Sequence, residues 1–258
     1  MGDGMKMSRR GLLARMFAGA CSLALAGCDR LSDTTWFPKV LGLGEKATYR
    51  AHRLILPRRA MAQEFTEADL SPRFRSNGTA MPGNPAYMRM ASNGFADYRL
   101  EVDGLVERPM NFSLDEIRAL PGRTQITRHD CVEGWSAIGK WKGARLSALL
   151  EAAHLKPDAR YVVFHCADHA EKTGSSAYYE SIDLDDAFHP QTILAYELNG
   201  KVLPVANGAP LRLRLERQLG YKMAKYVMGI EIVRDFSGIA GGKGGYWEDR
   251  GYEWYAGI

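Results

Sequence analysis

Cysteines are few in this sequence and lie far apart: the 258 residues contain four, at positions Cys21, Cys28, Cys131 and Cys166. Four scattered cysteines are too few for a scaffold held together by disulfide bonds. No two of them have the CxxC spacing of a structural zinc ribbon, and the CxxCH sequence that attaches c-type haem is absent. The cysteines therefore argue against disulfide-rich, zinc-ribbon and covalent-haem proteins.

The chain also lacks a strong excess of charge of either sign. It has 34 Lys and Arg against 30 Asp and Glu, a formal net charge of +4. Nucleic-acid-binding proteins normally carry a strongly basic face, so this balance argues against a nucleic-acid partner. The content of 46% hydrophobic and 25% charged residues is typical of a globular chain that buries a sizeable core, and it excludes a disordered or fibrous protein.

The first 28 residues predict an export signal. Arg9 and Arg10 precede an apolar run, Leu12–Ala26, that is interrupted by Arg15 and is shorter than the about 20 apolar residues of a membrane span. The twin arginines resemble the signal of the Tat pathway, so we expect a periplasmic protein. The ending Leu-Ala-Gly-Cys28 resembles a lipobox, and Asp29 resembles the residue that keeps enteric lipoproteins at the inner membrane. We therefore expect a lipid anchor at Cys28, with a plain amphipathic anchor or cleavage without lipidation as alternatives.

The remaining chain predicts a single α+β domain. Residues 29–95 are rich in Pro, Arg, Asn and Gly and show little periodicity, which predicts an extended segment that wraps the core formed by residues 96–258. In that core, Ser113 and Glu116 form a capping box that begins a short helix. Strands and short helices are mixed without regular βαβ spacing, which favours an α+β fold. We expect strands at 98–102, 105–106, 160–166, 211–216 and 226–233, and helices at 113–120 and 145–155.

Two local patterns have plain structural explanations. The alternation of leucine with charge at 211–216 alone fits a half-buried strand with Arg212 and Arg214 on its solvated face. His165, Cys166 and His169 are residue types that bind metals, but neighbours on a strand point to opposite faces. We therefore expect no separate metal site at that triplet.

The densest cluster of reactive side chains is Arg128–Ser136, with Cys131 at its centre. A cysteine among Arg and His is expected to have a lowered pKa, which would make it a nucleophile or a soft-metal ligand. Three interpretations of Cys131 stay open from the residues alone. It is a small buried hydrophobe, a nucleophile assisted by His129, or a metal ligand whose cofactor supplies the other ligands.

Several motifs follow this cluster in a fixed order, and together they resemble a known family. After Cys131–Ser136 come Trp141–Gly143 and a leucine-rich helix, and five further blocks follow. The set resembles the sulfite oxidase superfamily of molybdopterin-dependent oxidoreductases, closest to the branch of the bacterial periplasmic reductase that repairs methionine sulfoxide. The resemblance implies the α+β fold of that superfamily and a molybdenum–molybdopterin cofactor. The five blocks are His189-Pro190, Asn199–Lys201, Leu203-Pro204, Asn207–Arg212 and Gly220–Lys222.

The same resemblance implies roles for individual residues. Cys131 would ligate the molybdenum, and Arg212, Lys222 and Lys225 offer donors for the phosphate dianion of the pterin. The aromatic and acidic residues that follow the equivalent of Asn77 in the relative are missing here, which leaves the substrate open among sulfite, S-oxides and N-oxides. The residues assigned to the cofactor are Asn77, Cys131, Cys166, Asn207, Arg212, Gly220, Tyr221 and Lys222.

Residues beside the thiol are the candidates for substrate handling. Arg128 and His129 flank Cys131 and are expected to draw an anionic or polar oxo substrate to the metal. Asp130 and Glu133 are expected to orient basic neighbours rather than to act as acids.

The sequence thus predicts an exported enzyme that moves two electrons together with an oxygen atom at a molybdenum centre. It carries no cytochrome b5 module or immunoglobulin-like dimerisation domain, so we expect a monomeric catalytic subunit that exchanges electrons with a membrane cytochrome b. The aromatic residues at 246–255 fit either a packed closure of the core or a docking surface for that partner. A cofactor-free thiol enzyme using Cys131 and a non-catalytic lipoprotein are the alternatives.

Overall fold

The computed structural model describes residues 34–55, 57, 59–169 and 177–258. The chain divides into two compact units, Met1–Ala51 and His52–Ile258. The predicted export signal, with Cys21 and Cys28, lies outside the described residues. No helix within the described ranges is both long and apolar enough to cross a membrane.

The first described element is helix α2 (Phe37–Ile55), and here the prediction of an extended segment is wrong. Apolar residues recur three or four positions apart from Phe37 to Leu54, which is the period of an α-helix. Gly42 and Gly44 have low helix propensity and hide this period in the sequence. The helix forms in spite of them.

The segment between α2 and the first sheet is largely extended, as predicted. Its regular elements are the short η1 (Glu67–Asp69) and helix α3 (Pro85–Ser92), together with a single bridge from Glu64 to Thr127. The side chain of Asn84 caps α3 by accepting a hydrogen bond from the Ala86 amide.

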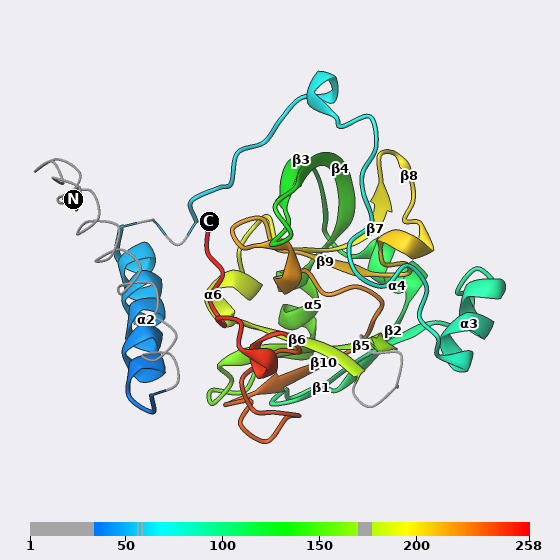
Figure 1. Ribbon diagram of the computed structural model, residues 1–258. Helices are drawn as coiled ribbons and strands as arrows, with labels where there is room; N and C mark the ends of the chain where they lie inside the picture. The colour runs from blue at the N-terminus through cyan, green and yellow to red at the C-terminus, as the bar shows by residue number, and fades with distance from the viewer. Residues whose placement is uncertain (1–33, 56, 58, 170–176) are drawn as a thin grey trace, which may run out of the picture. The chain divides into compact units, whose positions relative to one another are not determined.

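Two five-stranded sheets build the second unit, which confirms the α+β fold (Figure 1). The pair β1–β10 is parallel, and all other pairs among the described strands are antiparallel. The first sheet has the order β2 (Met110–Ser113), β1 (Arg99–Gly104), β10 (Val227–Val233), β5 (Tyr161–His169), β6 (Ala177–Asp183). The second has the order β3 (Gly122–Asp130), β4 (Ser136–Arg145), β7 (Ile193–Leu198), β8 (Lys201–Val202), and β9 (Arg212–Arg214) also pairs with β7. The remaining elements are α4 (Leu114–Ala119), α5 (Leu146–Ala153), α6 (Leu184–Ala187), η2 (Val205–Asn207), η3 (Gly220–Lys222) and η4 (Glu248–Arg250).

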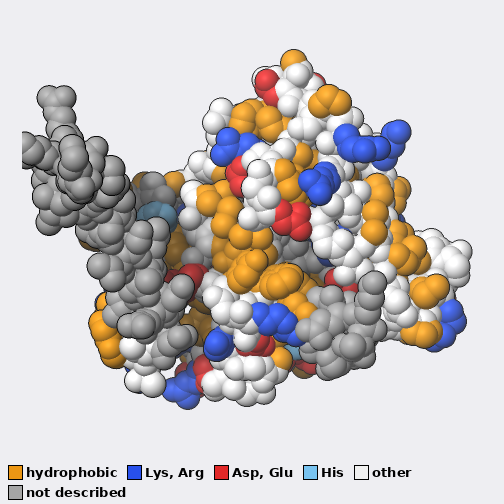
Figure 2. Space-filling view, viewed as in Figure 1, with side chains coloured by type: hydrophobic (Ala, Val, Ile, Leu, Met, Phe, Trp, Pro, Cys, Tyr) orange, Lys and Arg blue, Asp and Glu red, His pale blue; other side chains and the backbone are white. Residues whose placement is uncertain are grey.

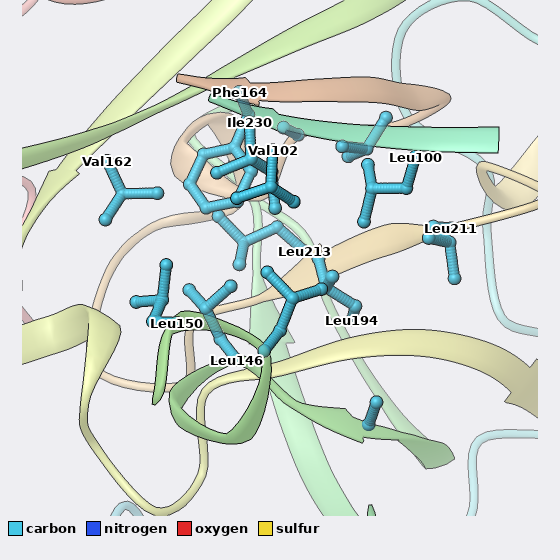
Figure 3. Packing of buried hydrophobic residues seen from close by; sticks show 14 of the residues in the cluster. Leu100, Val102, Leu146, Leu150, Val162, Phe164, Leu194, Leu211, Leu213 and Ile230 are labelled. Carbon is cyan, nitrogen blue, oxygen red and sulfur yellow. The ribbon is translucent and has the colours of Figure 1, made fainter. Parts of the chain in front are cut away.

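The main hydrophobic core lies between the sheets and includes α5. Figure 3 shows side chains of α5 meeting those of both sheets, among them Leu146, Phe164, Leu194 and Ile230. Removing such apolar surface from water is the main favourable term of folding. The predicted capping box is present as well, because Ser113 accepts from the Glu116 amide and Glu116 accepts from the Ser113 amide.

Two strand predictions need correction. The turn at Gly104 does end β1, but its antiparallel partner is β2, and Val106 makes only an isolated bridge to Leu155. The solvated Arg212–Arg214 face that the alternation alone suggested is also absent, because both arginines are fully buried. Strand β9 is covered on both faces, so its charged residues find partners inside the protein.

Charged side chains show no single-signed field on the face drawn in Figure 2. Lys and Arg side chains lie there among acidic and hydrophobic ones. This distribution agrees with the nearly even charge balance of the sequence.

Candidate active site

Cys131 begins the loop that joins β3 to β4. Asp130 pairs with Ser136 across the hairpin, which leaves the five residues 131–135 in the loop. The Cys131 amide donates to the Trp135 carbonyl at 2.9 Å, and the Gly134 amide donates to the Cys131 carbonyl at 3.0 Å. Gly134 has a φ of +83°, which glycine adopts without the cost that a side chain would add. These bonds fix the position of a thiol-bearing residue that is only 8% exposed.

The Cys131 loop forms one wall of a cavity of about 290 Å³. Segments that are far apart in the sequence build the other walls: the turn after Asn77, the end of β5, η3, and the C-terminal segment. The lining residues are Asn77, Gly78, Thr79, Cys131, Val132, Glu133, Asp168, Tyr178, Gly220, Tyr221, Met223, Lys225, Trp247 and Tyr252.

Burial raises the pKa of the Cys131 thiol, and the nearby Glu133 carboxylate adds to this effect. The expectation of a lowered pKa is therefore wrong for the protein by itself. The reason is that the two predicted cationic neighbours are not directed at the thiol. Arg128 is on the opposite face of β3 from His129, and its guanidinium pairs with Asp130 at 2.9 Å beside a second cavity of about 180 Å³.

His129 is fully buried and does not line the main cavity. Its Nδ1 accepts a hydrogen bond from Arg214 at 3.0 Å, and Arg214 also donates to the Met223 sulfur at 2.9 Å. Burial, together with Arg212 and Arg214, holds the pKa of His129 well below its usual value, so the imidazole is neutral. Gly220 packs against this ring. His129 therefore supports two residues of the cavity wall, Met223 and Gly220.

Arg212 and Lys225 bring buried positive charge to the side of the cavity near Asn77. Arg212 donates to the Asn207 carbonyl and to Asn77 Oδ1, each at 3.1 Å. Burial, followed by the charge of Arg214, lowers the pKa of Arg212 to about 9. The Lys225 ammonium donates to three backbone carbonyls at 2.6 to 2.9 Å, and burial beside Arg212 lowers its pKa to about 7.

Lys222, by contrast, has its ammonium bound between two buried carboxylates. Its Nζ donates to Glu180 and, at 2.6 Å, to Glu248, and it lies 5.3 Å from the centre of the Trp254 ring. Its neighbours Gly220 and Tyr221 line the cavity, whereas Lys222 itself does not. The structure thus places Lys225, rather than Lys222, at the cavity wall.

Comparison with known proteins decides the family. The model of the oxidoreductase molybdopterin-binding domain matches residues 87–238, which is more than half of the chain. The chain belongs to this molybdopterin-binding oxidoreductase family. The match includes most of the cavity wall described above, from Cys131 through Lys225.

Two relatives and one solved structure are similar to this family member. A protein of Azospira oryzae that bears the name protein-methionine-sulfoxide reductase subunit YedZ1 is 45% identical over 162 residues, 63% of this chain and 56% of that protein. The protein-methionine-sulfoxide reductase catalytic subunit MsrP of Ralstonia nicotianae is 35% identical over 144 residues, 53% of this chain and 44% of that protein. The chain thus spans about half the length of these relatives. The crystal structure of the sulfane dehydrogenase SoxCD from Paracoccus pantotrophus matches with a TM-score of 0.49 and 25% identity over 54% of this chain and 39% of that one.

Buried donors are grouped behind the cavity wall residue Asn77, although neither Arg212 nor Asn207 lines the cavity itself. Two buried side-chain nitrogens, Arg212 Nε and Asn207 Nδ2, have no hydrogen-bond partner among the described residues. Buried donors normally have a partner, so these two fit an acceptor that binds there. A guanidinium and an amide are suited to phosphate oxygens. The predicted residues Asn77, Asn207 and Arg212 are therefore brought together.

Cys166 lies apart from that group. It pairs with Val227 across β5 and β10, is buried in the main core, and does not line the cavity. Burial raises the pKa of its thiol well above the usual value. His165, its neighbour, points elsewhere and contacts Glu231 at 2.9 Å. No group of three His, Cys, Asp or Glu side chains in the described part of the chain could hold a metal by itself.

Sequence reasoning missed several wall residues. The aromatic pattern at 246–255 did mark the segment that contributes Trp247 and Tyr252. Asp168 and Tyr178, at the facing ends of β5 and β6, carried no local signal, because only the pairing of these strands brings them to the cavity.

Proposed function

We propose that this chain is the catalytic part of an oxidoreductase that reduces S-oxides, with methionine sulfoxide in proteins as the favoured substrate. The observation that carries this proposal is the cavity at Cys131, which has a buried thiol in its wall and two unpartnered phosphate-type donors, Arg212 Nε and Asn207 Nδ2, grouped behind its wall residue Asn77. When bound, the molybdenum cofactor supplies the two-electron oxo-transfer chemistry of the family.

The chain's own residues would hold that cofactor at two ends. Cys131, fixed by the hydrogen bonds of its loop, would provide the thiolate ligand of the metal. Arg212 and Asn207 would bind the phosphate through the nitrogens that have no other partner in the described structure. Lys225 would add positive charge, while its three carbonyl contacts keep it in position. Gly220 and Tyr221 would close the wall between the two ends.

At the Cys131 end of the cavity, the charge favours a neutral substrate over an anion, because the Glu133 carboxylate lies beside the thiol. The described lining residues include the carboxylates Glu133 and Asp168 and a single cation, Lys225. The apolar side chains of Val132 and Trp247 also line it. Because like charges disfavour binding, sulfite would be attracted less well than an uncharged sulfoxide. Reduction of a sulfoxide takes up two electrons and two protons and yields a thioether and water.

The names of both relatives support methionine sulfoxide as the substrate and a subunit arrangement. A subunit of this kind takes its electrons from another protein, and a membrane cytochrome b is the partner we propose. Tat export to the periplasm and a lipid anchor at Cys28 complete the proposal. These two features rest on the sequence motifs of the first 28 residues.

Metal analysis and turnover with a panel of substrates test this function. The purified protein should contain close to one molybdenum per chain and, with a reduced dye, should reduce methionine sulfoxide in a peptide faster than N-oxides. Sulfite with an oxidising dye should be turned over poorly. Cys131→Ala should lose the metal and the activity, whereas Cys166→Ala, whose thiol lies in the core, should retain molybdenum.

Other outcomes would support other functions. Activity of metal-free protein that depends on Cys131 would indicate a thiol enzyme. Protein without metal and without turnover would indicate a binding module.

A further inference from the structure

Helix α2 has two chemically distinct faces. At 3.6 residues per turn, its apolar residues fall on one side of the helix along its whole length. Many of these side chains are strongly exposed: Val40 by 49%, Leu41 by 55%, Leu43 by 61% and Leu54 by 87%. Such a row of exposed leucines is unusual. A contiguous apolar surface that is exposed normally marks a binding site. The apolar face comprises Phe37, Val40, Leu41, Leu43, Ala47, Ala51, Leu54 and Ile55.

A basic stripe borders one edge of this apolar face. Lys39, Lys46 and Arg50 are seven and four positions apart, which places them near one line along the helix, beside the line of Leu43 and Leu54, and all three are exposed. Glu45 is the only acidic residue in the helix. A helix whose apolar face is bordered by basic residues is typical of segments that lie in a membrane surface.

We propose that α2 lies flat on an anionic lipid bilayer, with its apolar face at the acyl boundary and its basic stripe at the headgroups. The charge complementarity favours a lipid surface over a protein groove, because the stripe offers cations to a continuous layer of phosphates. The helix does not satisfy the criteria for crossing a membrane, as no described helix does. It begins nine residues after Cys28, so it would add a second attachment next to the proposed lipid. This inference goes beyond the oxo-transfer reaction and does not depend on it.

Vesicle binding by the unlipidated chain tests the proposal. Residues 29–258 include every described residue but neither the proposed signal nor its lipid, so any binding comes from the protein itself. The cofactor-loaded chain should float with vesicles of phosphatidylglycerol and phosphatidylcholine. It should bind at least tenfold less to vesicles of phosphatidylcholine alone, and binding to the anionic vesicles should weaken as salt is raised.

Two variants locate the binding face. Leu41→Glu together with Leu43→Glu should reduce vesicle binding at least tenfold, because these two leucines lie at the two edges of the apolar face, and a charge at each edge would keep that face out of the bilayer. Lys46→Glu with Arg50→Glu should remove the preference for the anionic vesicles. The matched control is Val202→Glu, at a residue that is 72% exposed on β8 and should leave binding unchanged.

The activity of all three variants with a reduced dye should equal that of the parent chain, since none of the altered residues lines the cavity. A parent chain that does not float with anionic vesicles would overturn the proposal. Binding that survives the paired leucine changes would overturn it too, as would equal binding to vesicles of phosphatidylcholine alone. A failure of the reductase activity would leave these binding results unaffected, so the two proposals are tested separately.

Discussion

Gly220 is the position where a single methyl group should disturb the cavity most specifically. A Cβ built at Gly220 would lie 2.4 Å from Cε1 and 2.5 Å from Nε2 of His129. Carbon atoms in contact are normally about 3.5 to 4.0 Å apart, so either the ring or the η3 segment must move by about 1 Å. The ring is held by Arg214, whose guanidinium is itself bound to the buried Glu216 carboxylate at 2.7 Å. We therefore expect η3 to move in the Gly220→Ala variant.

The expected magnitude follows from this overpacking. Forcing one methyl group into a well-packed site costs about 1 to 3 kcal/mol of unfolding free energy. Gly229→Ala on β10 is the matched control, because its Cβ would meet the His165 Cβ at 3.8 Å, an ordinary contact. That control should be unchanged or more stable by up to about 1 kcal/mol, since alanine restricts the unfolded chain more than glycine does. Urea titrations of both variants measure the difference, and the molybdenum content of Gly220→Ala should fall because η3 lines the cavity.

A double variant tests the cause. Because His129 is the obstacle, Gly220→Ala should cost less in a His129→Ala background, with a coupling of about 1 kcal/mol or more. Strict additivity of the two changes would refute the steric explanation. So would a Gly220→Ala variant as stable as Gly229→Ala.

Two further predictions concern buried charges. Lys222→Met should cost about 3 to 5 kcal/mol in a urea titration, because Glu180 and Glu248 would be left buried without their cation, and Glu180→Gln added to it should recover part of that loss. An equal cost in the single and the double variant would contradict this account. Burial lowers the pKa of His189 to about 4, so its contribution to stability is full above about pH 6.5, its ordinary unfolded value, and is lost as the pH falls toward 4. His189 Nε2 donates to the Ala60 carbonyl, while Nδ1 accepts a hydrogen bond from the Gln191 amide. Protonation of Nδ1 would break the second bond, because two N–H donors would then face each other. As the pH is lowered, the urea midpoint of unfolding should fall more steeply in the wild type than in His189→Gln. Parallel curves of midpoint against pH would exclude His189 as the cause of the acid destabilisation.

Local patterns in the sequence determined several elements directly. The capping box of Ser113 and Glu116 and the leucine spacing of α5 depend on residues three or four positions apart. The local sequence is therefore sufficient to predict them. The family was also accessible, because Cys131 and the ordered motifs after it are contiguous blocks that need no knowledge of the fold. Helix α2 shows the limit of such patterns, since its two glycines obscured a period that was present.

Only the tertiary structure decided which charges meet. The sequence contains Lys222 and Lys225 as equivalent cations, but the packing of β6 and η4 gives the first to Glu180 and Glu248 and leaves the second at the cavity wall. Likewise the alternation around Arg212 fits a solvated strand face, whereas coverage of β9 on both faces buries Arg212 and leaves its Nε without a partner among the described residues. The physical reason is the same in each case. Periodicity is set by the backbone of one segment, but burial and ion pairing depend on segments that only folding brings together.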